Sequence, residues 1–154
     1  MRKLIVGTLI AAVAAGCATA GRQAEAPGQV VAERQRLMKL HAGLWKDIQE
    51  KAKAGNIEMI APSAEALALN ARHIPSLFPE GSLTENSKAK PEIWQRWPEF
   101  QQAARTLEAE AVRLRDAAAA RNAEATQALV KDFGRKACGS CHAPFRVPPQ
   151  QQRS

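Results

Sequence analysis

A helical repeat of apolar residues runs through most of this sequence, and it restricts the fold more than any other feature does. Between residues 30 and 55, Val31, Met38 and Trp45 recur every seven positions, with other aliphatic residues beside them. Apolar residues at this spacing form a stripe along one face of an α-helix. No segment has the alternating pattern of a β-strand, and much of the apolar content is alanine and leucine, which favour helix. The chain is therefore predicted to be all-α.

Prolines and glycines divide the periodic sequence into four helical segments. We expect the first from residue 30 to Gly55, the second from Pro62 to about Pro75 or Pro79, the third from after Pro91 or Pro98 to about residue 121, and the fourth from the cap at Asn122 to before Pro148. The stretch PEGSLTENSKAKP, between the second and third segments, is predicted to be a loop. Four amphipathic helices with such connections indicate an up-down-up-down bundle.

The first 20 residues are predicted to be an export signal, because a basic start precedes an apolar stretch too short for an ordinary membrane-spanning helix. Two cleavage sites compete. Cleavage before Cys17 would leave a lipidated cysteine as the new N-terminus, whereas conventional cleavage would follow Ala20. Residues 21–29 then form a polar tether, residues 30–147 the bundle and residues 148–154 a disordered tail. Either cleavage predicts a periplasmic protein, and the first predicts a membrane-anchored lipoprotein.

The charge distribution argues against nucleic-acid binding. The formal net charge is +7, but Arg2 and Lys3 lie in the export signal and the other basic residues are scattered among acidic ones. Nucleic-acid binding needs a concentrated basic footprint, and aromatic residues make up only 5% of the chain. A mildly basic surface of this kind suits an acidic protein partner better.

The segment KACGSCHAPFR, residues 136–146, carries the strongest chemical motif. Cys138, Cys141 and His142 are spaced i, i+3 and i+4, so they project from one side of a helix. The pattern C-x-x-C-H is the attachment signature of c-type haem, in which two thiols bond to the haem vinyl groups and the imidazole reaches the iron. A disulfide between the two cysteines would close only a tiny loop and contribute little stability.

Other interpretations of these cysteines stay open at this point. A structural zinc site needs four ligands, and the sequence has no second cysteine pair, so His41 and His73 would have to complete it. A thioredoxin-like dithiol needs a βαβ setting, which the sequence lacks. A third interpretation is that the two cysteines are inert. A haem interpretation has one geometric point in its favour: an antiparallel bundle brings Met38, early in the first helix, to the same end as His142, late in the fourth.

Four segments of the chain resemble segments of the class II c-type cytochromes, the cytochrome c′ family, and they occur in the same order. They are RQRLMK, IPSLFP, KPEIWQRWPEF and RKACGSCHAPFR. The resemblance implies an exported four-helix bundle with one haem c attached covalently near the C-terminus. It implies thioether bonds from Cys138 and Cys141 and proximal ligation of the iron by His142. Met38 resembles the distal ligand of the low-spin cytochrome c-556 branch, although from the residues alone it would be a core side chain.

The same resemblance implies an electron carrier rather than an enzyme, with transient redox protein partners and a homodimer as one state. The alternative within the family is a high-spin protein whose iron is five-coordinate and binds small gases such as NO or CO. Arg34, one turn before Met38, and Arg146, just after the motif, are expected to contact the haem propionates. Phe145 is expected to pack on the haem or a neighbouring helix.

The remaining histidines and the tryptophans receive structural assignments. His41 and His73 are interpreted as ordinary helix residues. Trp45, Trp94 and Trp97 are interpreted as core or loop-anchoring residues.

Overall fold

The structure is a computed structural model that describes residues 26–149 of the 154. The predicted export signal, Cys17 and the tether up to residue 25 lie outside the described residues. Residues 150–154 of the predicted tail lie outside them too.

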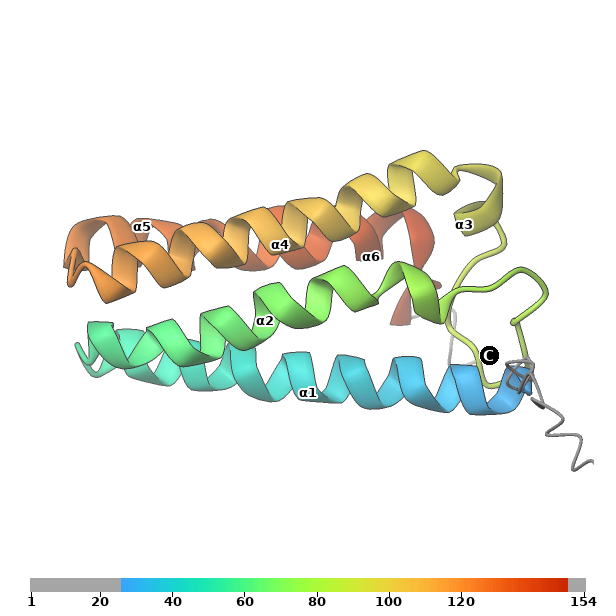
Figure 1. Ribbon diagram of the computed structural model, residues 1–154, viewed down its shortest axis with the longest axis horizontal. Coiled ribbons are helices and arrows are strands. Elements are labelled where there is room, and N and C mark those ends of the chain that lie inside the picture. The colour runs from blue at the N-terminus through green and yellow to red at the C-terminus, as the bar shows by residue number, and fades with distance from the viewer. Residues whose placement is uncertain (1–25, 150–154) are drawn as a thin grey trace, which may run out of the picture.

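Four helical rods form an up-down-up-down bundle, as Figure 1 shows. The rods are α1 (Pro27–Lys53), α2 (Ala61–His73), α4 (Trp97–Ala119), and a composite of α5 (Ala123–Phe133), the π-helical turn η3 (Gly134–Cys138) and α6 (Gly139–Phe145). Short helical turns lie in the connections: η1 (Ile57–Ile60), η2 (Pro75–Leu77) and α3 (Glu92–Gln95). Residues 26–149 contain no β-strand beyond one isolated bridge. The predicted fold class is confirmed.

The first helix begins earlier than the sequence pattern indicated. Pro27 is the first residue of α1, so the last three residues of the predicted tether, 27–29, are helical. Proline suits this position because a first-turn N–H has no partner within the helix. The helix ends at Lys53, with Ala54 as its C-cap. Gly55, the next residue, has a φ of +76°, a left-handed conformation that glycine adopts easily.

Both prolines proposed for the start of the third helix mark helix starts. Pro91 caps the short α3, the chain breaks at Arg96, and α4 begins with Pro98 in its first turn. At the next turn, the side chain of Asn122 accepts a hydrogen bond of 3.0 Å from the backbone N–H of Ala125. This contact confirms the predicted cap of α5.

The fourth rod differs from the single regular helix that the sequence predicted. The turn Gly134–Cys138 is π-helical, with one residue more than an α-helical turn. Phe133, just before this turn, and Ala137, within it, are almost completely buried in the core. The periodicity of the sequence did not reveal the extra residue, because a single wide turn barely disturbs the apolar pattern.

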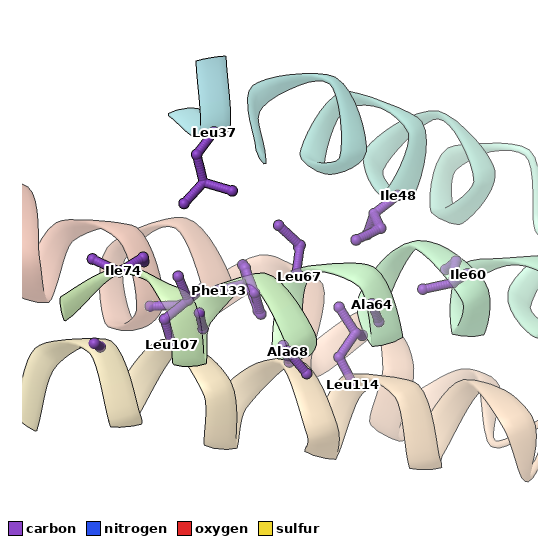
Figure 2. Close-up of a cluster of buried hydrophobic side chains, with 14 of the residues drawn as sticks. Leu37, Ile48, Ile60, Ala64, Leu67, Ala68, Ile74, Leu107, Leu114 and Phe133 are labelled. Atoms are coloured by element: carbon purple, nitrogen blue, oxygen red, sulfur yellow. The ribbon is translucent and has the colours of Figure 1, made fainter. Parts of the chain in front are cut away.

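The core lies along the bundle axis and combines Leu, Ile and Phe side chains with alanines (Figure 2). Phe100, Phe133, Ile48 and Leu114 are each 1% exposed or less. Burying a side chain of this size stabilises the fold by about 1.5–3 kcal/mol. Where α2 packs on α4, buried alanines such as Ala68 let the two helices approach closely.

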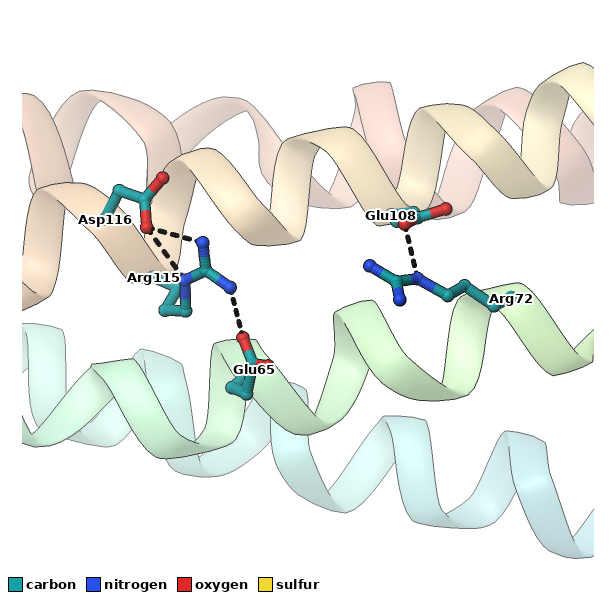
Figure 3. A network of polar contacts seen from close by, with 5 residues as sticks. All are labelled: Glu65, Arg72, Glu108, Arg115 and Asp116. Atoms are coloured by element: carbon teal, nitrogen blue, oxygen red, sulfur yellow. Dashed lines mark hydrogen bonds and ion pairs between the residues drawn. The ribbon is translucent and has the colours of Figure 1, made fainter.

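Ion pairs connect α2 and α4 on their outer surface (Figure 3). Arg115 contacts Glu65 at 2.6 Å and Asp116 at 2.7 Å, and Arg72 contacts Glu108 at 2.5 Å. These pairs are largely solvent-exposed, so each contributes at most about 1 kcal/mol. Among the helices in residues 26–149, none is both long enough and apolar enough to cross a membrane.

Candidate functional site

A cavity of about 580 Å³ lies inside the bundle near the end that carries the loop between α2 and α3. All four rods and that loop contribute to its lining. The cavity brings together every described residue that the sequence assigned to a haem site: Met38, His142, Cys138, Cys141, Arg34 and Arg146. These residues are separated by up to 112 positions in the sequence (Arg34 to Arg146), and the antiparallel arrangement of the first and fourth rods places them in one lining.

The motif C-x-x-C-H spans the junction between the π-helical turn and α6. Both cysteines are free thiols that face the cavity. Burial raises the pKa of both thiols, and for Cys141, to which Cys138 adds a smaller effect, the value is about 11. Both thiols are therefore protonated at neutral pH. They do not form the disulfide that their spacing would allow.

His142 lies on α6, one position after Cys141, and its side chain is exposed toward the cavity. Burial of the imidazole and, to a smaller extent, the charge of Arg146 lower the pKa of His142. The imidazole is therefore neutral at pH 7, and a neutral ring nitrogen has the lone pair that a metal ligand needs.

Met38 enters the same cavity from α1 and packs partly against the hydrophobic core. The cavity thus receives a thioether from one helix and an imidazole from another.

Arg34 is buried, with 6% of its surface exposed, and it fastens the loop to α1. Its guanidinium donates hydrogen bonds to the carbonyl oxygen of Leu77 and to both the carbonyl and hydroxyl oxygens of Ser82. It also lies 4.0 Å from the ring centroid of Phe78, a cation–π contact. These hydrogen bonds use three of the five N–H groups of the guanidinium, so two remain for another acceptor.

No carboxylate within residues 26–149 forms an ion pair with Arg34. Burial lowers its pKa to about 10, so the side chain still carries its charge at neutral pH. A buried cation with spare donors at the cavity wall favours an anionic group beside it.

We expect Arg34→Leu to lower the free energy of unfolding by about 2–4 kcal/mol, because it leaves buried acceptors of Leu77 and Ser82 unpaired. Hydrogen exchange of the amides in residues 78–91 should accelerate as the loop is released. The matched control is Arg36→Leu, since Arg36 is exposed and pairs only with Glu33 on the same helix. That change should cost less than about 1 kcal/mol. Equal losses in chemical denaturation would contradict the fastening role of Arg34.

The backbone around Arg146 is paired with the loop. Ala89 and Arg146 form an antiparallel bridge, the N–H of Lys90 donates to the carbonyl of Phe145 at 3.0 Å, and the N–H of Val147 donates to the carbonyl of Lys88 at 2.9 Å. This pairing fixes where Arg146 enters the cavity lining. The sequence placed Arg146 near the motif but did not predict the pairing.

His41 belongs to the cavity as well, although the sequence was interpreted as giving it no special role. It lies three positions after Met38 and therefore on the same face of α1. Its Nε2 is buried and has no hydrogen-bond partner within the described residues. Burial and, to a smaller extent, the nearby His142 lower its pKa to about 4, so it is neutral at pH 7. The spacing to Met38 was the sequence signal that pointed to this position.

The aromatic residues surround the site as structural elements. Trp45 stacks on Phe133 with ring centroids 4.9 Å apart, and Trp97 stacks on Phe100 at 5.5 Å. The indole N–H of Trp94 donates to the carbonyl of Phe78 at 3.0 Å and so anchors the loop.

Two further residues behave as the sequence indicated. Phe145 is buried and packs edge-to-face on Phe100. His73 is exposed and contacts only Ser76.

The cavity lining fits the haem that the motif predicts. Most of the lining is apolar, and its volume lies within the range of ordinary ligand pockets. The lining contains two thiols, which could bond to the haem vinyl groups, and a neutral imidazole, which could bind the iron. It also contains buried or half-buried cations, which could pair with the haem propionates. The buried Nε2 of His41 and the unpaired charge of Arg34 are polar groups that protein contacts do not satisfy. By contrast, the described residues hold no group of three or more His, Cys, Asp or Glu side chains able to bind a metal ion, so they offer no zinc site.

Comparison with known proteins gives a consistent result. The model of the family described as cytochrome c′ matches residues 29–146. Cytochrome c-556 of Agrobacterium tumefaciens (strain II Chrys) is 30% identical over 120 residues, which cover 76% of this chain and 96% of the relative. Cytochrome c-554 of Cereibacter sphaeroides is 39% identical over 75 residues, which cover 47% of this chain and 48% of the relative. This second match therefore spans only about half the length of the curated c-554 protein.

Solved structures with the same arrangement of helices include two cytochromes c′. One is the nitric oxide complex of a mutant of cytochrome c prime from Alcaligenes xylosoxidans, with a TM-score of 0.70, 25% identity, and coverage of 79% of this chain and 96% of that chain. The other is a cytochrome c′ described by its ligand-controlled dimer dissociation, with a TM-score of 0.73, 24% identity, and coverage of 81% and 99%.

Proposed function

This chain belongs to the cytochrome c′ family, and on that premise we propose that it is a periplasmic electron carrier whose haem iron is bound by His142 and Met38. The family and the C-x-x-C-H motif make it a c-type haem protein with one covalently attached haem c, and its similarity to cytochromes c-554 and c-556 supports the electron-carrying role. The observation that carries the finer proposal is the single cavity lined by an imidazole from α6 and a thioether from α1.

In this proposal Cys138 and Cys141 hold the haem through thioether bonds. This assignment is supported by the position of both cysteines in the cavity lining, together with His142. Covalent attachment suits an exported protein, which cannot readily recover a lost cofactor. Arg34 and Arg146 are assigned to the haem propionates, and the two remaining N–H donors of Arg34 support this assignment.

Electron transfer follows from what the residues around the site do. When bound, the haem supplies an iron that changes its charge by one electron. Met38 from α1 and His142 from α6 would hold the iron, which would leave no position for a substrate, and a thioether ligand would favour the ferrous state. The mostly apolar lining would surround the cofactor with hydrophobic side chains. Among the described residues of the lining there is no Asp or Glu, and the proposal assigns both the imidazole of His142 and the thioether of Met38 to the iron, so it includes no enzymatic activity.

The second candidate function is a five-coordinate cytochrome that binds small gases. The observation in its favour is the similarity to a structure determined as a nitric oxide complex. It requires Met38 to pack in the core without binding the iron.

Carbon monoxide distinguishes the two functions. Absorption spectra of the matured protein should be recorded in the oxidised and reduced states, with and without CO. We expect a low-spin spectrum and a reduced form that resists CO at neutral pH. Rapid and tight CO binding by the reduced native protein would favour the gas-binding function instead.

Export and assembly complete the proposal. A lipid on Cys17 would tether the bundle to a membrane surface through the residues that precede α1, and it would restrict the search for redox partners to that surface. Homodimer formation is supported by the half-exposed Leu40 on α1 and Leu69 on α2, which are 50% and 53% exposed. A structurally similar cytochrome c′ is described as a dimer that dissociates under ligand control.

A further inference from the structure

The charged residues that line the cavity are all cationic. They are Arg34, Lys39, Lys88 and Arg146, and the described lining includes no acidic residue. Arg34 is buried at the loop, whereas Lys39 and Lys88 are exposed and Arg146 is half-buried. Lys39, Lys88 and Arg146 are thus the cations of the lining that reach the protein surface, and they are called the cationic mouth below.

The cationic mouth is assembled by three separate parts of the chain. Lys39 follows Met38 on α1, Lys88 lies in the loop and Arg146 ends α6. The backbone pairing of Ala89 with Arg146, and of Val147 with Lys88, holds the last two together. Their convergence is therefore a property of the fold.

The charges of the cationic mouth are not neutralised by neighbouring carboxylates. Within residues 26–149, most other basic residues lie within 4.0 Å of an acidic partner: Arg36, Lys46, Lys51, Arg72, Arg96, Arg113, Arg115, Arg121, Arg135 and Lys136. None of the three mouth residues has such an ion pair in that part of the chain, and the proposed propionate contact would use Arg146 and leave Lys39 and Lys88 unpaired in the haem-loaded protein. An unpaired charge projects a stronger field into the solvent than a paired one, so the positive potential of this face is concentrated where the cavity opens.

We propose that the cationic mouth is the docking surface for an acidic protein redox partner. The inference rests on the proposed electron-transfer function and adds the place and the charge of the partner. A partner that docks here comes close to the edge of the cofactor in the cavity. One electron then passes between the iron and a one-electron redox group of the partner, while no bond forms or breaks and no proton moves.

Charge complementarity favours a protein over a membrane surface. Recognition of anionic lipid typically uses clusters of about four to eight Lys or Arg residues, whereas the mouth has three around an apolar opening. Three charges around an apolar centre match a small, transient protein interface with a polar rim. Such charges accelerate association by about 10–1000-fold at low ionic strength.

The test compares two charge reversals in the haem-loaded protein. The mouth variant is Lys39→Glu/Lys88→Glu, which leaves Arg146 and its proposed propionate contact intact. The control variant is Lys53→Glu/Arg105→Glu, which changes the net charge equally. Both control residues are exposed, have no ion pair in the described residues and lie outside the cavity lining. Along α1, Lys53 is about 21 Å from Lys39.

Two probes of opposite charge are used in stopped-flow measurements. Reduced flavodoxin, an acidic protein, donates an electron to the oxidised cytochrome, and tris(phenanthroline)cobalt(III), a cation, accepts an electron from the reduced cytochrome. At low salt we expect the mouth variant to react with flavodoxin about tenfold more slowly and with the cobalt complex no more slowly than the native protein. The control should change the flavodoxin rate less than about twofold. At about 1 M salt, where the Debye length is about 3 Å, the differences should disappear.

The outcomes separate this inference from the proposed function. Equal slowing by both variants would show that net charge rather than position matters, and unchanged flavodoxin rates would show that docking occurs elsewhere. Either result overturns the docking surface, even though normal spectra and normal reaction with the cobalt complex would leave the electron carrier intact. Binding to phosphatidylglycerol vesicles that only the mouth variant loses, with an unchanged flavodoxin rate, would assign the surface to a membrane and also overturn the proposal.

Discussion

Met38→Leu should convert a low-spin protein into a high-spin one that binds carbon monoxide when reduced. Leucine lacks the sulfur that the proposed ligation requires, but it has a volume close to that of methionine, so the packing against the core is retained. The loss of this competing ligand should increase the CO affinity of the reduced protein by about 100-fold or more, which corresponds to roughly 3 kcal/mol. The reduction potential should fall, since a thioether favours ferrous iron. Absorption spectra, CO titration and potentiometry measure these three effects.

Met59 supplies the matched control for this prediction. It lies on η1, is 54% exposed and is not part of the cavity lining. Met59→Leu should leave the spectrum, the CO affinity and the potential unchanged. Because Met38→Leu should cost less than about 1.5 kcal/mol of stability, the comparison is made on folded protein. A spectrum of Met38→Leu identical to that of the native protein would remove Met38 from the coordination of the iron.

Cys138→Ala/Cys141→Ala should abolish covalent attachment of the haem. In the native protein the pigment should stay with the polypeptide after denaturation and extraction with acidified organic solvent, whereas in the double variant it should be extracted completely. A covalently held cofactor has a local concentration far above its dissociation constant, and a ligand present at about 1,000 times that constant stabilises the native state by about 4 kcal/mol. Loss of the haem should therefore lower the unfolding temperature by about 10 °C.

The third cysteine gives the control for this experiment. Cys17→Ser should change at most the processing and anchoring of the N-terminus and should leave the pigment attached. The single variants Cys138→Ala and Cys141→Ala each keep one thiol, so some attachment through one bond is expected. They also provide a readout if the double variant does not accumulate. Pigment that remains covalently bound in the double variant would contradict the assignment of both sulfurs.

Much of the fold could be predicted because its determinants are local. The seven-residue recurrence of Val31, Met38 and Trp45 follows from the geometry of one helix face, and so does the cap at Asn122. The break between α3 and α4 at Arg96 was harder to predict from the sequence. Two prolines, Pro91 and Pro98, each offered a valid start, and the chain uses both of them.

Other features depend on contacts between distant segments, which no local pattern encodes. Arg34 was expected at the propionates, but its structural role is to hold Leu77 and Ser82 of the loop, 43 and 48 positions away. The spacing of Arg34 to Met38 indicates the face of the helix. It does not indicate which backbone carbonyls another segment presents to that face.

His41 illustrates the same limit for the candidate site. A histidine on a helix is most often a solvated or hydrogen-bonded residue, and the spacing of His41 to Met38 indicates only that the two share a helix face. Its buried and unpartnered Nε2 follows from the packing of the other rods around α1. The π-helical turn that ends at Cys138 was also not predicted from the sequence. It lies against the core, where Phe133 and Ala137 are buried.

The sequence by itself determined the helical architecture, the covalent haem chemistry and the identity of the residues that can carry it. Helical periodicity, proline and glycine positions and the motif C-x-x-C-H are short-range signals, because each depends on bonding or geometry within a few residues. The tertiary structure alone decided that Met38 and His142 share one cavity lining, that Arg34 serves the loop and that Lys39, Lys88 and Arg146 converge at its opening. The physical reason is that burial, desolvation and summed charge arise from segments that meet only when the chain is packed.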